Sequence, residues 1–190
     1  NITVRLARGD DAAAIQAIYA PIVRDTPTSF ELAVPSVAEM RDRVERTLQQ
    51  LPWLVAEAPD GAITGYAYAS RHRERAAYQW AGDVSVYVHE QRRGQGVGRT
   101  LYHALFAILR AQGFVTVCAG ITLPNPGSIA LHESMGMRPV GVYRQVGFKQ
   151  GAWHDVGWWQ GTLQAYPIEP APAIPLPALT GWERMLVISG

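Results

Sequence analysis

The segment from Val84 to Arg99 constrains the fold of this chain more than any other part of its sequence. Val84, Val86 and Val88 alternate with other residues, as the side chains on one face of a strand do. The apolar spacing of a helix starts at Val97, and three glycines lie at its beginning: Gly94, Gly96 and Gly98. The free N–H groups and the positive dipole end of a helix start bind anions, and glycine lets the backbone approach a pyrophosphate closely. The segment therefore predicts a strand, a phosphate-binding loop and a helix, in that order.

Two well-known phosphate loops do not match this segment. A Walker loop requires Gly-Lys followed by Ser or Thr, which the segment lacks, so the sequence argues against an ATPase. A dinucleotide-binding fold requires Gly-x-Gly-x-x-Gly in an early βαβ unit, with an acidic residue about 20 positions further on. Here the spacing is Gly94-x-Gly96-x-Gly98, and the loop lies in the middle of the chain. What remains is a loop of the form Arg93-x-x-Gly96-x-Gly98.

Periodicity places the other elements on both sides of this loop. Apolar and polar alternation predicts seven strands, at residues 2–6, 53–57, 63–70, 83–89, 114–122, 138–148 and 153–163. Helical spacing predicts four helices, at residues 12–23, 36–50, 97–112 and 128–135. Asp10 and Asp11 are N-cap candidates for the first helix, and Gly113 closes the third. The order βααβββαβαββ predicts an α/β protein in which helices cover a mixed sheet.

The composition is that of one soluble globular domain. The chain has 190 residues, 48% of them hydrophobic and 17% charged, and no apolar run approaches the roughly 18 residues of a membrane span. Its formal net charge of +1 gives no general electrostatic case for binding nucleic acid or a membrane. Because a signal-peptide pattern is also missing, we expect a cytoplasmic protein. Cys118 is the only cysteine and we expect a buried thiol, while the histidines lack metal-site spacing, so we expect no metal.

The sequence changes character after Leu163. Five prolines between residues 167 and 177 are incompatible with a helix or a central strand and predict an extended arm. Residues 182–188 are apolar enough to dock on the body of the protein or on a second subunit. We therefore expect one domain over residues 1–163 and a Pro-rich extension over residues 164–190.

The loop and its surroundings resemble a known family. Arg93-x-x-Gly96-x-Gly98, within this order of elements, is similar to the acetyl coenzyme A loop of the GCN5-related N-acetyltransferases (GNAT). The resemblance implies the GNAT fold, with a mostly antiparallel, twisted sheet of about seven strands and about four helices, and a homodimer. Six further motifs between residues 2 and 163 resemble the phosphinothricin and methionine sulfoximine acetyltransferase subfamily: Thr28-Ser-Phe-Glu31, Ala77-Tyr-x-Trp80, Ser85-Val-Tyr-Val-His89, Leu123-Pro-Asn125, Ser128-x-x-Leu-His-Glu133 and Gly151-x-Trp-His-Asp-Val-Gly-x-Trp-Gln160.

The resemblance also implies which residues hold acetyl coenzyme A, the expected co-substrate. Its pyrophosphate is expected on the glycine-rich loop and the start of the following helix. A backbone N–H group of the preceding strand is expected to polarise the acetyl carbonyl group, and two residues after the next strand to contact the pantetheine arm or its surroundings. The implied cofactor residues are Val86, Tyr87, Val88, Arg93, Gly94, Gln95, Gly96, Val97, Gly98, Arg99, Asn125 and Ser128.

Acetyl transfer to an amine requires a base for the amine and a proton for the leaving thiolate. The subfamily usually has a glutamate base where this chain has Asp83, whose carboxylate reaches roughly 1.5 Å less far, about one bond length. Proton removal through a bridging water tolerates that shift better than direct contact. The subfamily's histidine after Asn125 is matched by His132, which we expect to supply the thiolate proton or to hydrogen-bond the thioester side of the cofactor. The alternatives are that Asp83 only caps the strand and that His132 is a satisfied helix residue.

The acceptor side is implied by the same resemblance. It lies between Phe30, the segment that contains Arg73, Arg75 and Tyr78, and the last hairpin. Since a guanidinium binds a carboxylate in a fork, Arg73 and Arg75 are candidates for an acceptor carboxylate, and Phe30 and Tyr78 for an apolar wall. The alternative is a solvated loop beside core aromatic residues.

The predicted function is acetylation of a small amino-acid-like amine, of the phosphinothricin or methionine sulfoximine type, by direct attack in a ternary complex. One alternative is an acetyltransferase for another small amine or a protein N-terminus. The other is an acetyl coenzyme A binding module in which Asp83 marks lost chemistry.

Overall fold

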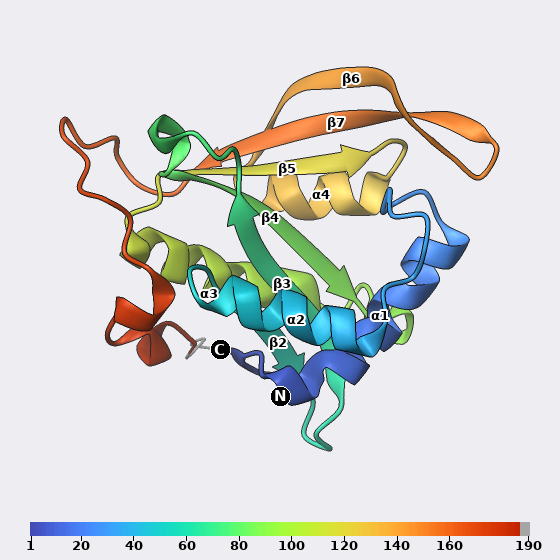
Figure 1. The fold of residues 1–190 in the computed structure, drawn as a ribbon, viewed down its shortest axis with the longest axis horizontal. Coiled ribbons are helices and arrows are strands. Elements are labelled where there is room, and N and C mark those ends of the chain that lie inside the picture. Colours follow the sequence, from blue (N-terminus) through green and yellow to red (C-terminus); the bar gives the residue numbers. More distant parts are fainter. Residues whose placement is uncertain (187–190) are drawn as a thin grey trace.

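The computed structural model describes residues 1–186, and a seven-stranded sheet runs through its centre (Figure 1). In the order β1-β2-β3-β4-β5-β7-β6, the sheet contains β1 (Thr3–Leu6), β2 (Trp53–Glu57), β3 (Ile63–Arg71), β4 (Ala81–Val88), β5 (Thr116–Thr122), β7 (Ala152–Thr162) and β6 (Arg138–Lys149). The four helices are α1 (Ala12–Asp25), α2 (Val37–Leu48), α3 (Val97–Gln112) and α4 (Pro126–Ser134). The predicted α/β class and the order βααβββαβαββ are confirmed.

Local signals in the sequence set the ends of α2 and α3. Ser36 accepts a hydrogen bond from the N–H group of Glu39, while the Glu39 carboxylate accepts one from the N–H group of Ser36, which makes a capping box before α2. α3 begins directly after Gly96 and ends directly before Gly113, as predicted. Both glycines have left-handed backbones, with φ of +82° and +99°, a conformation that other residues adopt at a cost.

Three predicted element starts are wrong by two residues. β4 starts at Ala81 rather than at residue 83, because Ala81 and Gly82 already pair with Thr116 and Val117 of β5. α4 starts at Pro126 rather than at residue 128, because the Asn125 side chain accepts from the N–H group of Ser128 and proline suits a first helical turn. β5 starts at Thr116 rather than at residue 114, because the N–H groups of Val115 and Thr116 converge on one carbonyl oxygen before regular pairing begins.

All neighbouring strands of the described sheet are antiparallel except β4 and β5. These two run parallel for only three residue pairs, which start at Ala81 with Thr116 and end at Asp83 with Cys118. Beyond Asp83 the strands diverge (Figure 1), while β4 stays paired with β3 as far as Val88. The second half of β4 therefore has an edge that no neighbouring strand covers.

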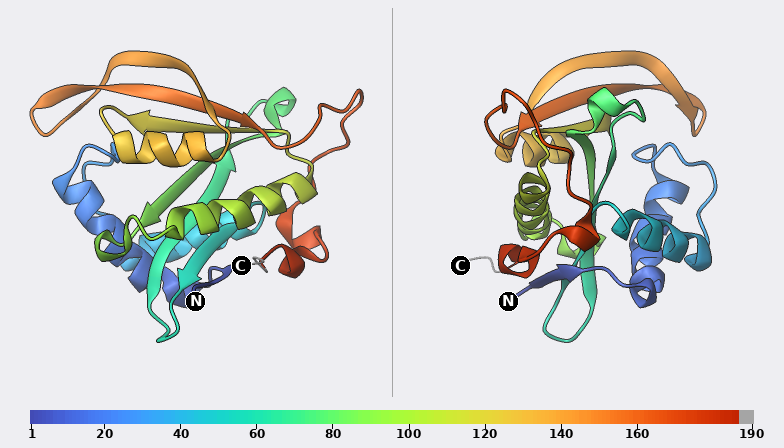
Figure 2. Two further views of the ribbon diagram at one scale, coloured as in Figure 1. Left: turned by 180° about the vertical axis from the view of Figure 1, so that it is seen from behind. Right: turned by 60° about the vertical axis from the view of Figure 1, so that its left-hand side comes forward.

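Each face of the sheet has its own core (Figure 2). α3 covers one face, where Leu101 and Leu105 are fully buried with Val84. α1 and α2 cover the opposite face, where Ile15 and Val44 are equally buried. Such burial of aliphatic side chains is the main favourable contribution to folding. None of the helices described within residues 1–186 has the length and apolar character needed to cross a membrane.

The Pro-rich arm runs back along the body of the protein. The Gln112 side chain, at the end of α3, donates to the carbonyl oxygens of Gln50 and Ile174, both over 2.9 Å. The N–H group of Leu176 donates to Gln50 over 3.0 Å, and the Leu176 side chain is 4% exposed. The arm therefore docks on the body of its own chain. Of the apolar segment expected to dock, Val187 and Ile188 lie outside the described residues.

We expect Leu176→Ala to lower the free energy of unfolding by about 2–4 kcal/mol, because it leaves a cavity where the arm meets the core. The matched control is Ile168→Ala on the same arm, where the side chain is fully exposed and the expected change is below about 0.5 kcal/mol. Urea unfolding followed by tryptophan fluorescence measures both. Equal stabilities of the two variants would contradict the docked arm.

Candidate functional site

A cleft of about 510 Å³ lies where β4 and β5 have diverged. Its walls come from β4, from the glycine-rich loop with the start of α3, and from the start of α4. Of the residues predicted for the cofactor, all but Gln95 line it. The Gln95 side chain instead donates to the carbonyl oxygen of Gln91 over 3.1 Å, within the loop.

The glycine-rich loop presents unpaired backbone N–H groups to this cleft. Gly94 and Gly96 have φ of +73° and +82°, and Gly96 stands at the N-cap position of α3, where it has no side chain to satisfy the first helical N–H groups. The first hydrogen bond of this helical turn runs from the N–H group of Thr100 to the carbonyl oxygen of Gly96. A Cβ atom added at either glycine would meet no atom within 4 Å. The loop is thus an open, uncapped helix start, which suits a phosphate group.

The exposed edge of β4 forms the long wall of the cleft. Successive residues of a strand direct their N–H groups to opposite sides, and the N–H group of His89 donates to the carbonyl oxygen of Thr64 on β3. The amides of Val86 and Val88 therefore point to the other side, from which β5 has moved away. The side chain of Arg93 donates to the carbonyl oxygen of Val88 over 3.3 Å. Unpaired backbone N–H groups need a hydrogen-bond partner. For Val86 and Val88, that partner has to be a molecule in the cleft.

His132 lies behind the cleft, on α4, and is 4% exposed. Its Nδ1 is 2.7 Å from the carbonyl oxygen of Ser128, so Nδ1 carries the proton and donates. Nε2 then accepts from the Tyr102 hydroxyl group over 2.8 Å. Burial lowers the pKa of His132, and the hydrogen bond to Ser128 opposes that shift only in part. The ring is therefore neutral with both nitrogens engaged, and the proton-donor role implied for His132 stays a prediction.

Asp83 faces the other side of the sheet. Its Oδ1 is 2.7 Å from Nδ1 of His72, and the two side chains are 24% and 20% exposed. Burial raises the pKa of Asp83, while the hydrogen bond with His72 opposes the rise. Cys118, the cross-strand partner of Asp83, is buried as expected. Burial and the charge of Asp83 raise the pKa of its thiol to about 11, so it stays protonated at neutral pH.

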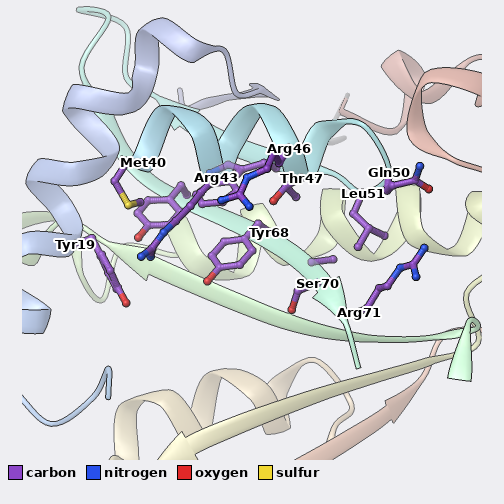
Figure 3. Close-up of a pocket in the computed structure, with 13 residues that line it drawn as sticks. Tyr19, Met40, Arg43, Arg46, Thr47, Gln50, Leu51, Tyr68, Ser70 and Arg71 are labelled. Atoms are coloured by element: carbon purple, nitrogen blue, oxygen red, sulfur yellow. The ribbon is translucent and has the colours of Figure 1, made fainter. Parts of the chain in front are cut away.

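A second cavity, of about 370 Å³, lies on the face of the sheet that α1 and α2 cover (Figure 3). It opens between α2 and β3, and the pairing of Ser70 with Asp83 brings its end beside that carboxylate. Its polar lining includes Arg43, Arg46, Thr47, Ser70 and Arg71.

Two of the side chains around this cavity differ in their hydrogen bonding. Arg43 is paired with Glu31 through contacts of 2.9 and 2.5 Å, and this pairing holds the pKa of Glu31 below its ordinary value. Trp53 is 3% exposed, and its indole N–H group has no hydrogen-bond partner within residues 1–186. A buried donor without a partner is costly, so the cavity suits a ligand or water with an acceptor atom.

The predicted acceptor residues are divided between two places. Arg73, Arg75 and Tyr78 line a cavity of about 290 Å³, which the arm closes with residues 173–175. Phe30 packs instead on the last hairpin, where its ring fills the place of a Cβ atom at Gly147. The described contacts therefore keep Arg73, Arg75 and Tyr78 together and leave Phe30 apart from them.

The sequence did not indicate that His72 pairs with Asp83, or that a cavity, which we call the α2 cavity, opens between α2 and β3. His72 stands in the arginine cluster before Trp80, and a lone histidine in a charged loop gives no signal for a partner eleven positions later. Arg43 reads as one of many charged residues on an amphipathic helix. Only the register of β3 against β4 brings these side chains to one place.

The sheet has a phosphate-type loop on one face and a carboxylate on the other. Known proteins are similar to this chain. Residues 4–158 match the family described as an acetyltransferase (GNAT) domain. The chain belongs to the GNAT family of acetyltransferases. The family predicted from Arg93-x-x-Gly96-x-Gly98 is thereby confirmed, and the enzyme class with it.

Three relatives show which members of the family this chain is similar to. Phosphinothricin N-acetyltransferase of Alcaligenes faecalis is 43% identical over 165 residues, which cover 86% of this chain and 83% of that protein. L-methionine sulfoximine/L-methionine sulfone acetyltransferase of Salmonella typhimurium is 34% identical over 166 residues, 87% of this chain and 96% of that protein. The crystal structure of a phosphinothricin acetyltransferase from Sinorhizobium meliloti, in complex with acetyl coenzyme A, has a TM-score of 0.87 at 34% identity and covers 94% of this chain and 97% of that one.

Tyr102→Phe tests the hydrogen bond that holds His132. The variant leaves a buried ring nitrogen without a donor, so we expect a loss of about 1–3 kcal/mol in the free energy of unfolding. Tyr166→Phe, at an exposed tyrosine outside the last hairpin, is the matched control with an expected change below about 0.5 kcal/mol. Urea unfolding at neutral pH measures both, and a loss that is no larger at Tyr102 would contradict the assigned geometry.

Proposed function

We propose that this protein transfers the acetyl group of acetyl coenzyme A to the amino group of a small amino-acid-like acceptor, of the phosphinothricin or methionine sulfoximine type. One observation carries the proposal. The divergence of β4 and β5 puts an uncapped helix start on one face of the sheet and a half-buried carboxylate on the other, beside the same strand. The two relatives that act on such acceptors, and the relative with acetyl coenzyme A bound, support it.

The cofactor residues follow from the open backbone groups of the cleft. The N–H groups at the start of α3, with Arg93 and Arg99 nearby, suit the pyrophosphate. The uncovered edge of β4 suits the amide groups of pantetheine, since an extended chain satisfies a strand edge by pairing with it. Asn125 and Ser128 form the opposite wall. When bound, acetyl coenzyme A supplies an activated thioester to these residues.

The chain's own residues handle charge and protons during the transfer. The N–H groups of Val86 and Val88 lie along the cleft and suit the carbonyl oxygen, whose negative charge grows as the amine attacks. Asp83 and His72, joined by a hydrogen bond, form the basic pair on the proposed acceptor face. We propose that His132 positions Ser128 and the start of α4, on the side of the cleft where the thiolate leaves.

The acceptor is expected on the face that holds Asp83. Arg73 and Arg75 provide guanidinium groups at the edge of this face, which suit the carboxylate of an amino acid. The α2 cavity beside Ser70 has room for a side chain, and the free indole N–H group of Trp53 favours an acceptor atom on it. These features support a polar, amino-acid-like acceptor over an apolar amine.

We also propose that the protein is located in the cytoplasm.

We also propose that the protein is a homodimer that assembles through its last hairpin. β6 is an edge strand of the sheet, and its apolar side chains are open to solvent. Contiguous exposed apolar side chains on a strand edge mark a protein interface. Those of the hairpin include Val140, Val142, Tyr143, Val146, Phe148 and Trp153.

A thiol-release assay with acetyl coenzyme A separates the candidate functions. We expect release with L-methionine sulfoximine or phosphinothricin. A matched amine without the carboxylate should have at least about tenfold lower kcat/KM, because a charged hydrogen bond contributes about 1.5–3 kcal/mol. Release that is fastest with a peptide N-terminus would instead favour a protein acceptor. Calorimetric binding of the cofactor without release from any acceptor would favour a binding module.

Val142→Glu tests the proposed dimer, because it buries a charge in the expected interface. Sedimentation analysis should show a dimer for the natural protein and a monomer for the variant. Ile168→Glu, at a fully exposed position of the arm, is the control and should stay dimeric. A natural protein that sediments as a monomer would contradict the proposal.

A further inference from the structure

His72 and Asp83 form a closed pair at the point where β4 and β5 part. His72 directly follows β3, and its N–H group donates to the carbonyl oxygen of Ala81 on β4. This backbone contact brings the ring to Asp83, where Nδ1 and Oδ1 are 2.7 Å apart. A carboxylate only accepts, so Nδ1 carries the proton. The remaining nitrogen, Nε2, then has a lone pair and no hydrogen-bond partner within residues 1–186.

The groups around the ring hold it in this orientation. Trp158 on β7 meets it edge to face, with centroids 6.1 Å apart at 85°, and Tyr78 also meets it edge to face, at 5.8 Å and 66°. Cys118 on β5 has a neutral thiol. The Arg73 side chain donates to the backbone carbonyl oxygen of His72, and its positive charge favours the ionised form of Asp83. Within residues 1–186, Asp83 is the one anionic side chain that hydrogen-bonds the ring.

The pair compensates for the short side chain of Asp83. Aspartate reaches about 1.5 Å less far than the glutamate usual in the subfamily, and one of its oxygens is already bonded to His72. The imidazole extends the basic site by the width of a ring, and Tyr78 and Trp158 pack beside that ring. A carboxylate on Nδ1 fixes the tautomer and stabilises the imidazolium that forms when Nε2 takes a proton.

We propose that Nε2 of His72 is the atom that takes the proton from the acceptor amine, and that Asp83 positions and charges the ring instead of acting as the base itself. This inference rests on the proposed acetyl transfer. The acceptor arrives as an ammonium ion, and His72 removes one proton to give the amine and an imidazolium. The amine nitrogen forms a bond to the acetyl carbon as the carbon–sulfur bond breaks. A second proton leaves the nitrogen for the thiolate, and the imidazolium releases its proton to solvent.

A double-mutant cycle tests the proposal. His72→Gln is expected to lower kcat/KM by about 100-fold or more, the usual contribution of a general base. It should also remove the loss of activity that protonation of an imidazole causes on the acid side of the pH profile. Asp83→Glu restores the missing reach, so the same His72→Gln change in that background should cost less than about tenfold. His103→Gln, at an exposed histidine on α3, is the control and should leave kcat/KM and the pH profile unchanged.

Equal losses in both backgrounds, or an unchanged pH profile in His72→Gln, would overturn the proposal while leaving acetyl transfer intact. A natural protein without thiol release would overturn both. Unchanged cofactor affinity in each variant shows that the fold is preserved.

Two further readouts do not depend on the cycle. Nitrogen-15 NMR of the natural protein should find His72 protonated on Nδ1, and the Nε2-protonated tautomer would contradict the assignment. The ligand atoms of His72, Asp83 and Cys118 also lie within 4.8 Å of one another, close enough to share a metal ion. Activity that is lost with a chelator and restored by Zn²⁺ would replace the proposal with a metal site, and activity unaffected by the chelator supports the proton-transfer role.

Discussion

Parallel strands β4 and β5 share only three residue pairs, and the arrangement of the site follows from the point at which they part. Up to Asp83, β4 and β5 are paired, the sheet is continuous and each face has its own core. Beyond Asp83, the edge of β4 is uncovered, with the glycine-rich loop at its end. One strand thus presents alternate residues to two compartments. Val86 and Val88 line the cleft proposed for the cofactor, while Asp83 lies on the face proposed for the acceptor.

The local parts of this arrangement could be predicted from the sequence. The loop from Arg93 to Gly98 and the whole of α3 were predicted with correct bounds, because glycine geometry and helical periodicity act over a few residues. The starts of α4 and β5 were missed by two residues, since a side-chain cap at Asn125 and a shared carbonyl oxygen at Trp80 decided them. Those contacts leave little trace in a hydropathy pattern.

The acceptor face could be predicted only in part, because it is assembled by long-range register. Asp83 was found through the motif around it, whereas its partner His72 directly follows β3 and becomes visible only once β3 is paired with β4. The α2 cavity is a similar case, since its walls come from four elements of the chain. A resemblance to a family assigns roles only to the residues that match the family's motifs. It gives no information about a residue elsewhere in the chain that compensates for a substitution within a motif.

The docked arm has a consequence for how acceptor range can diverge. Residues 173–175 close the cavity that holds Arg73, Arg75 and Tyr78, yet they lie outside residues 4–158, where the family match ends. The wall is held by Gln112, whose side chain ties the arm to the ends of α2 and α3. Exchange of the arm between relatives would therefore alter the shape of this cavity and leave the cofactor loop and Asp83 untouched. Under the proposed function, the arm thus shapes the acceptor site separately from the residues that bind the cofactor and handle protons.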